Sequence, residues 1–178
     1  MKIQPLERLI QPDARTLRFT PQGFSLQGTL KPEASLEFVQ GLIKDCLLDE
    51  KVPDDLRKQF DTICMLHVHG FFVYEFFTIA FSQMLFLLEG ALRLWFAERH
   101  QTKKTPSGLQ SLLAHVENSG ALSGIASKKQ MEALRRLRDH FAHPKGLTIL
   151  TPIDSAQRIR DGALLINALW GEKTGAKK

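Results

Sequence analysis

The sequence predicts an all-α protein, an up-and-down bundle of about five to six helices with a small β-hairpin near the N-terminus. Three observations lead to this fold class. Apolar residues recur at the helical period from Pro32 to Trp170. The segments that follow this period are joined by mostly short connections, which is typical of a bundle. Hydrophobic residues make up 43% of the 178 residues, enough for the core of one domain.

The first thirty residues have a different pattern. Residues 16–20 alternate polar and apolar side chains, Pro21 to Gly23 supply turn residues, and residues 24–27 alternate again, which predicts a hairpin. The chain therefore divides into three parts: an N-terminal extension over 1–30, a helical bundle over 31–171, and a basic, disordered tail over 172–178.

Three helices are expected in the first part of the bundle. The first runs from about Glu33 to Leu48, and the second follows Pro53 and is interrupted at 67–70. The third extends from Phe71 to about His100, which is about 45 Å of helix. The inward face of the first helix is formed by Leu36, Val39, Ile43, Cys46 and Leu47.

The third helix is long and apolar enough to cross a bilayer. It also contains Glu75, Glu89 and Arg93, and each charge near the centre of a bilayer costs about 2.5 kcal/mol or more. We therefore expect a buried helix of a protein with no membrane partner.

Three further helices complete the bundle. Ser107 caps a helix that ends near Gly120, Ser127 caps one that ends at Pro144, and Asp154 or Ser155 caps the last.

Composition limits the classes of function. The net charge of +5 and pI near 9.4 are mildly basic and only slightly favour a polyanionic partner. Cys46 and Cys64 lie in apolar helical patterns, and residues 1–11 contain no signal peptide, so we expect reduced thiols in a cytoplasmic protein.

The sequence predicts no cofactor and no metal. It contains no glycine-rich phosphate loop, no Gly-x-Ser-x-Gly elbow and no cysteine zinc pattern. The pairs His140 with His143 and His67 with His69 have spacings that a metal site could use, but the sequence places no third ligand beside either pair.

Residues 134–144, Leu-Arg-Arg-Leu-Arg-Asp-His-Phe-Ala-His-Pro, carry the clearest chemistry. Asp139 and His143 are neighbours on a helix, so the carboxylate could fix the histidine tautomer. Arg138 is turned about 140° from His143 on an ideal helix, but Pro144 biases the preceding histidine out of the helical region. A guanidinium suits phosphate oxygens and a histidine suits proton transfer. The alternative is a solvated helix face without catalytic function.

This segment resembles the R-x4–6-H signature of HEPN domains, in which a polar residue, most often asparagine, follows the arginine; here it is Asp139. The stretch Leu88-Glu-Gly-Ala-Leu-Arg93 is similar to the Glu-x3-Lys/Arg feature of an earlier helix in many of these domains. Residues 163–170 resemble the family's closing helix.

The resemblance implies a homodimer whose two Arg–His pairs line one cleft, and a metal-independent endoribonuclease, often a toxin or defence effector. It assigns proton transfer at the RNA 2′-hydroxyl and leaving oxygen to His143, charge stabilisation on the phosphate to Arg138, and orientation to Asp139. Glu89, Arg93 and His140 would support the site; for Glu89 and Arg93 the alternative is a simple i,i+4 ion pair.

A basic surface on the same helix is a candidate RNA guide, although such a run is often only solvated. Its residues are Lys128, Lys129, Arg135 and Arg136.

Three hypotheses follow. The first is a HEPN-like homodimer that cleaves or at least binds RNA, with an antitoxin or regulatory protein as a further partner. The second is a non-catalytic member of the same fold that binds RNA, a nucleotide or a protein. The third is an unrelated helical bundle in which the Arg–His pair is a coincidence.

Overall fold

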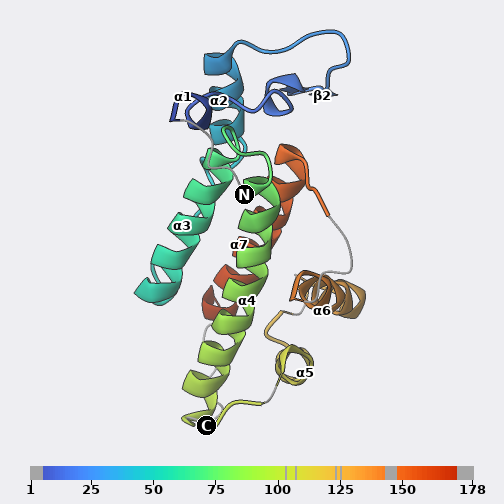
Figure 1. Ribbon diagram of the computed structural model, residues 1–178. Helices are drawn as coiled ribbons and strands as arrows, with labels where there is room; N and C mark the ends of the chain where they lie inside the picture. The colour runs from blue at the N-terminus through green and yellow to red at the C-terminus, as the bar shows by residue number, and fades with distance from the viewer. Residues whose placement is uncertain are drawn as a thin grey trace. The chain divides into compact units, whose positions relative to one another are not determined.

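A computed structural model describes residues 6–102, 104–106, 108–122, 124, 126–142 and 148–171. Within these residues the regular secondary structure is helical apart from one small hairpin, so the predicted all-α fold is confirmed (Figure 1). The predicted tail, residues 172–178, lies outside the described residues. The described elements are, in order, α1 (Leu6–Leu9), η1 (Thr16–Arg18), β1 (Phe19–Thr20), β2 (Gly23–Phe24), α2 (Pro32–Gly41), α3 (Asp54–His69), α4 (Phe76–His100), α5 (Leu109–Ser119), α6 (Lys128–Ala142) and α7 (Pro152–Gly171).

These elements belong to two compact units, and α3, α4 and α7 each contribute residues to both. The first unit contains the hairpin and α2, and the second contains α5 and α6. The first unit consists of Met1–Cys46, Asp61–Phe81 and Thr148–Arg160, and the second of Leu47–Phe60, Ser82–Leu147 and Asp161–Lys178.

The hairpin of the first unit is shorter than the alternating pattern predicts. β1 and β2 pair antiparallel with Phe19 opposite Phe24 and Thr20 opposite Gly23. Gly23 has a φ of 111°, a conformation that glycine adopts without strain. Phe19 is buried in a cluster with Val39, Tyr74 and Phe77, which attaches the hairpin to the core of this unit.

The first long helix ends early. The expected span was Glu33 to Leu48, but α2 ends at Gly41. The Leu42 carbonyl accepts hydrogen bonds from Nε and Nη2 of Arg160, while the Cys46 amide donates to Ile43. In a continuing helix the Leu42 carbonyl would accept from the Cys46 amide, so these hydrogen bonds replace the helical pattern after Gly41. Leu47, which the helical period placed inward, is consequently 69% exposed.

The helical pattern is interrupted between the second and third helices, but later than the predicted 67–70, because α3 continues to His69. α3 ends at His69, and a Cβ added to Gly70 would lie 2.6 Å from the Phe77 ring, so only glycine fits there. Turns occupy the next residues, and α4 begins at Phe76 rather than Phe71. The 25 residues of α4 correspond to about 37 Å of helix.

Among the described residues, α4 is the one helix whose length and composition would allow it to cross a membrane. Of its most apolar window, 56% is buried inside the protein, and the core helix of a water-soluble protein has the same character.

α7 begins with a different cap from the expected one. The Thr151 hydroxyl accepts a hydrogen bond from the Asp154 amide at 3.1 Å and donates one to the Asp154 carboxylate at 2.7 Å. Ser155, which was a candidate cap, is instead fully buried, and its hydroxyl donates to the Phe77 carbonyl at 2.7 Å.

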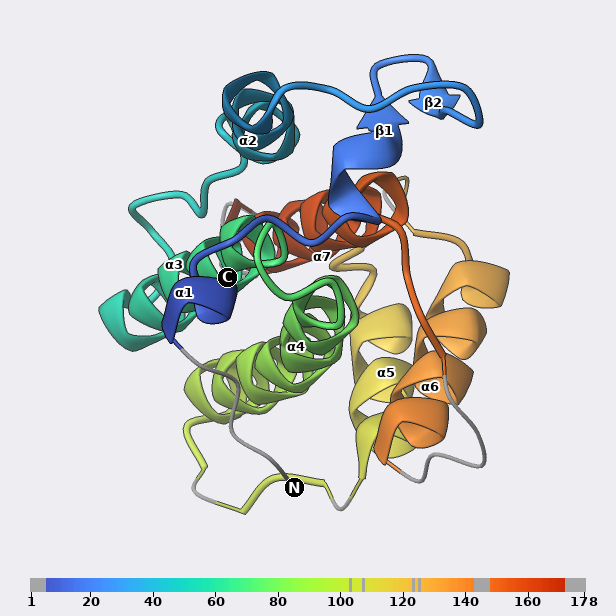
Figure 2. The ribbon, with the colours of Figure 1, turned by 45° about the horizontal axis from the view of Figure 1, so that its top comes forward.

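In the second unit, α5 and α6 run side by side (Figures 1 and 2). α5 ends where Gly120 takes a left-handed conformation with a φ of 74°, as expected for its C-terminal glycine. Ser127 caps α6 as predicted: its hydroxyl accepts from the Gln130 amide, and the Gln130 side chain accepts from the Ser127 amide.

Candidate functional site

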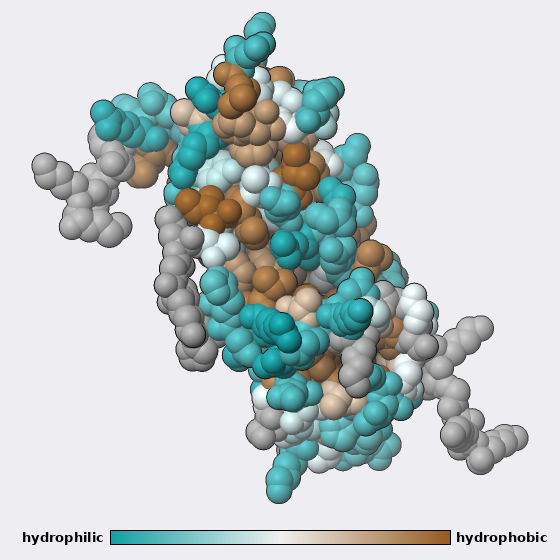
Figure 3. Space-filling view, turned by 90° about the vertical axis from the view of Figure 1, so that its right-hand side faces the viewer, coloured by the Kyte–Doolittle hydropathy of each residue, from teal (hydrophilic) through white to brown (hydrophobic). Residues whose placement is uncertain are grey.

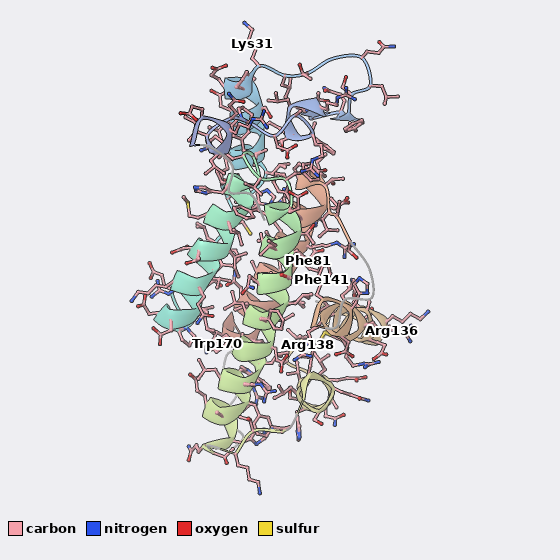
Figure 4. The ribbon with its side chains drawn as sticks, viewed as in Figure 1. Lys31, Phe81, Arg136, Arg138, Phe141 and Trp170 are labelled. Atoms are coloured by element: carbon pink, nitrogen blue, oxygen red, sulfur yellow. The ribbon has the colours of Figure 1, made fainter. Side chains whose placement is uncertain are left out.

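The candidate site lies in the second unit, where α6 presents Arg138 to Glu89 of α4. Nε of Arg138 donates a hydrogen bond of 2.8 Å to Oε2 of Glu89. In Figure 4, Arg138 lies on the side of α6 that faces α4, whereas Arg136 extends away from α4. The arginine of the Arg–His segment is therefore fixed by an acid from an earlier helix.

Glu89 is the centre of a three-residue cluster. The residue is 8% exposed, and its second oxygen accepts a 2.7 Å hydrogen bond from Nη2 of Arg93, one helical turn later. Nη1 of Arg93 donates to the Pro106 carbonyl at 3.3 Å. A largely buried carboxylate thus pairs with two guanidinium groups, and each of its oxygens has a charged donor.

The ionised state of Glu89 follows from these partners. Burial by itself would raise the pKa of the Glu89 carboxyl group. The hydrogen bonds and positive charges of Arg93 and Arg138 outweigh this effect, so the pKa lies below its ordinary value. Glu89 is therefore a carboxylate at neutral pH, and it orients Arg138 rather than exchanging protons.

Phe86 completes the surroundings of Arg138. It lies on α4 one turn before Glu89, and the Arg138 Cζ is 5.8 Å from the centroid of its ring, within the range of a cation–π contact. The Phe86 side chain is nevertheless 41% exposed. Nothing in the sequence pattern distinguishes Phe86, because it lies within a continuous apolar stretch of α4.

Asp139 contacts two arginines of its own helix, α6. Its Oδ2 accepts a 3.0 Å hydrogen bond from Nη1 of Arg135, and its Oδ1 lies 3.7 Å from Nη1 of Arg138. Asp139 thus links the two arginines on the surface of one helix. Helical spacing had predicted only its proximity to His143.

The basic surface of α6 is partly neutralised by Glu132, which was not among the predicted site residues. Glu132 accepts hydrogen bonds from Arg135 and Arg136, and these lower the pKa of its carboxyl group to about 2. The spacings of three and four residues could have revealed these pairs. Lys129 is exposed, and no carboxylate of the described residues forms an ion pair with it.

A groove of about 630 Å³ lies between α5 and α6. Leu113 and Met131 provide apolar surface in it, and the basic and acidic side chains of α6 form part of its wall. Hydrophobic residues reach the surface shown in Figure 3 at several places among hydrophilic ones.

The remaining predicted residues are less informative. His140 is exposed on α6, with its ring centroid 5.5 Å from that of Phe141. α6 is described as far as Ala142, so His143 lies outside the described residues, as does the side chain of Lys128.

The histidine pair of α3 is divided between two environments. His67 is fully buried; its Nδ1 is 3.1 Å from the Ser155 hydroxyl, and its Nε2 has no hydrogen-bond partner among the described residues. His69 is exposed, and its Nδ1 is 2.8 Å from the Met65 carbonyl. In the described part of the chain, no three histidine, cysteine or acidic side chains form a group that could hold a metal ion.

The cluster of Arg138, Glu89, Arg93 and Phe86 is therefore the candidate site. It combines an oriented guanidinium, a second cation and an exposed aromatic ring. A comparison of the chain with protein-family models, with curated proteins and with solved structures gave no match.

Proposed function

We propose that the protein is a HEPN-like homodimer that cleaves RNA without a metal ion. The supporting observation is the contact between Glu89 and Arg138. The resemblance to HEPN domains rests on two separate segments, the Glu-x3-Arg sequence and the Arg–His sequence. In the folded chain one hydrogen bond joins the acid of the first segment to the arginine of the second, and the same acid binds Arg93.

The reaction that we propose is an internal transfer at phosphorus. The RNA 2′-oxygen attacks the adjacent phosphate, the bond from phosphorus to the 5′-oxygen breaks, and a 2′,3′-cyclic phosphate and a 5′-hydroxyl are formed. His143 takes the proton of the 2′-hydroxyl or gives one to the leaving oxygen. Arg138 stabilises the charge that develops on the phosphate oxygens. Its hydrogen bond to Glu89 keeps the guanidinium of Arg138 oriented for this role.

A dimer suits this chemistry because the reaction needs a proton acceptor and a proton donor at the same time. One histidine cannot be in both protonation states at once. Two copies of the Arg138–His143 segment at a shared cleft would supply both.

The alternative is a protein of the same fold that binds RNA, a nucleotide or a protein without catalysis. One observation favours the protein-binding form of this alternative. Arg135 and Arg136 are paired with Glu132, and Arg135 also with Asp139, so the surface of α6 attracts a polyanion less than its arginines suggest.

The test is cleavage of a labelled single-stranded RNA by the purified protein with EDTA present. We expect cleavage by the wild type, and loss of cleavage in His143→Ala and in Arg138→Gln. Lys58→Gln, which removes an exposed cation of α3 outside the proposed site, is the matched control and should retain activity. Circular dichroism would show that each variant is folded. Unchanged cleavage by His143→Ala would exclude the assigned role of His143, and binding without cleavage by the wild type would favour the alternative.

A further inference from the structure

Phe86 is an exposed aromatic side chain in an otherwise largely buried helix. Its neighbours along α4, Leu85, Leu87 and Leu88, are each at most 5% exposed, whereas Phe86 is 41% exposed. Exposing a large apolar ring to water is unfavourable. The contacts of the described residues leave much of this ring uncovered.

The surface beside Phe86 is open. Gly90 lies four residues later, on the same side of α4, and a Cβ added there would meet no atom within 4 Å beyond the helix's own backbone and chain neighbours. A glycine in the interior of a helix is less favourable than alanine, and no packing contact explains its presence here. Together, Phe86 and Gly90 form an accessible aromatic surface next to a flat area of backbone.

The guanidinium of Arg138 lies at the edge of this surface. Its Cζ is 5.8 Å from the Phe86 centroid, and Glu89, between Phe86 and Gly90 in sequence, holds its Nε. A cation that binds a phosphate is therefore adjacent to a ring that can stack on a base. This pairing of positive charge with an exposed aromatic ring is how proteins bind single-stranded nucleic acid without reading its sequence.

We propose that Phe86 stacks against a nucleobase of single-stranded RNA, on the nucleotide next to the phosphate that Arg138 binds. The site then selects single strands, because a base paired in a duplex does not expose its face to the ring. Gly90 provides the room for that base. The inference rests on the proposed function and adds to it the class of RNA and the residue that recognises it.

The first experiment measures cleavage by wild type, Phe86→Leu and Phe86→Trp. The substrates are a short single-stranded RNA, the same RNA with one abasic nucleotide beside the mapped cleavage site, and a duplex of the same sequence. We expect the abasic substitution to raise the KM of the wild type by about 5- to 150-fold, the range that stacking of one base supplies. Phe86→Leu should show a similar rise on the intact RNA and no further rise on the abasic RNA. Phe86→Trp should retain tight binding.

The second experiment uses Gly90. Gly90→Leu should weaken binding of the intact single strand because its side chain occupies the open area, while Gly90→Ala should bind nearly as the wild type does. Both variants should be at least as stable as the wild type to urea, since a Cβ at position 90 meets no neighbour and both residues are better helix formers than glycine.

The outcomes separate the two proposals. If the wild type cleaves RNA but is indifferent to the abasic nucleotide, or if Phe86→Leu remains sensitive to it, stacking on Phe86 is wrong and the ribonuclease proposal stands. If the wild type neither cleaves nor binds single-stranded RNA, the proposed function is wrong and the stacking inference fails with it.

Discussion

Arg138 and Glu89 lie 49 residues apart in the chain, and in the fold the arginine Nε and the glutamate Oε2 are 2.8 Å apart. The same carboxylate holds Arg93. Two arginines thus depend on one largely buried acid, and this arrangement determines both the orientation of Arg138 and the energetic cost of removing the acid.

Glu89→Gln should lower the free energy of unfolding by about 1–3 kcal/mol, because it leaves two guanidinium groups without the carboxylate that neutralised them. Urea denaturation would measure the change. Glu132→Gln is the matched control: Glu132 also pairs with two arginines, but on an exposed surface, where water screens the charges. The control should change stability much less, and equal effects of the two variants would contradict the importance of burial at Glu89.

As the pH is lowered from 6.5 to about 4, the free energy of unfolding should decrease because of His67. Burial, and then the charge of Arg160, lower the pKa of His67 from 6.5 to about 4. In this range the unfolded chain binds a proton that the folded chain does not, so acid favours unfolding, by roughly 3 kcal/mol at the lower end. Urea midpoints across this pH range would show the slope.

His67→Gln should remove most of that slope, whatever its effect on stability at neutral pH. His69→Gln is the control, since the ring of His69 is exposed two residues later, and it should retain the wild-type slope. A slope that persists unchanged in His67→Gln would show that other groups cause the acid sensitivity.

Gly70→Ala should destabilise the protein by about 1–3 kcal/mol, because the new methyl group would lie 2.6 Å from the Phe77 ring and the turn after α3 would have to shift. Gly41→Ala, at the end of α2, meets no atom within 4 Å and should be neutral or slightly stabilising. Thermal unfolding of the two variants compares them directly; a destabilised Gly41→Ala would show that the loss is not caused by the ring contact.

The cations of α6 should contribute unequally to RNA binding. Lys129→Gln should reduce the slope of log Kd against log salt by about 0.7, the value for one phosphate contact on a single strand. Arg135→Gln should reduce it less, because Glu132 and Asp139 already balance the charge of Arg135. Binding measured by fluorescence anisotropy at several salt concentrations gives these slopes. Equal reductions would mean that RNA displaces the acidic partners.

Features that depend on local chemistry could be predicted from the sequence. Ser127 caps α6, because its hydroxyl accepts a hydrogen bond from the Gln130 amide while the Gln130 side chain accepts one from the Ser127 amide. Gly120 ends α5, because glycine adopts the left-handed conformation there without strain. Gly70 separates α3 from α4. Each of these depends on residues only a few positions apart.

Features that depend on distant residues could not be predicted. Arg160 donates to the Leu42 carbonyl from 118 residues away. The backbone hydrogen bonds after α2 are therefore no longer helical, and helical spacing wrongly placed Leu47 in the core. At the candidate site, the spacing of Glu89 and Arg93 suggested their ion pair. Sequence spacing gave no information about the contact of Phe86 with Arg138, because that contact joins two helices. For Glu89, the resemblance to HEPN domains implied a supporting place at the site, but not the hydrogen bond to Arg138.

The sharing of α3, α4 and α7 between the two units has a consequence for making shorter versions of the protein. Neither unit is encoded by one continuous stretch of the gene, because each takes three separate segments of the chain. A fragment that stops before Pro152 would lack α7, and with it part of both units. Shortening the chain from its C-terminal end should therefore yield an aggregation-prone product rather than an independently folded half.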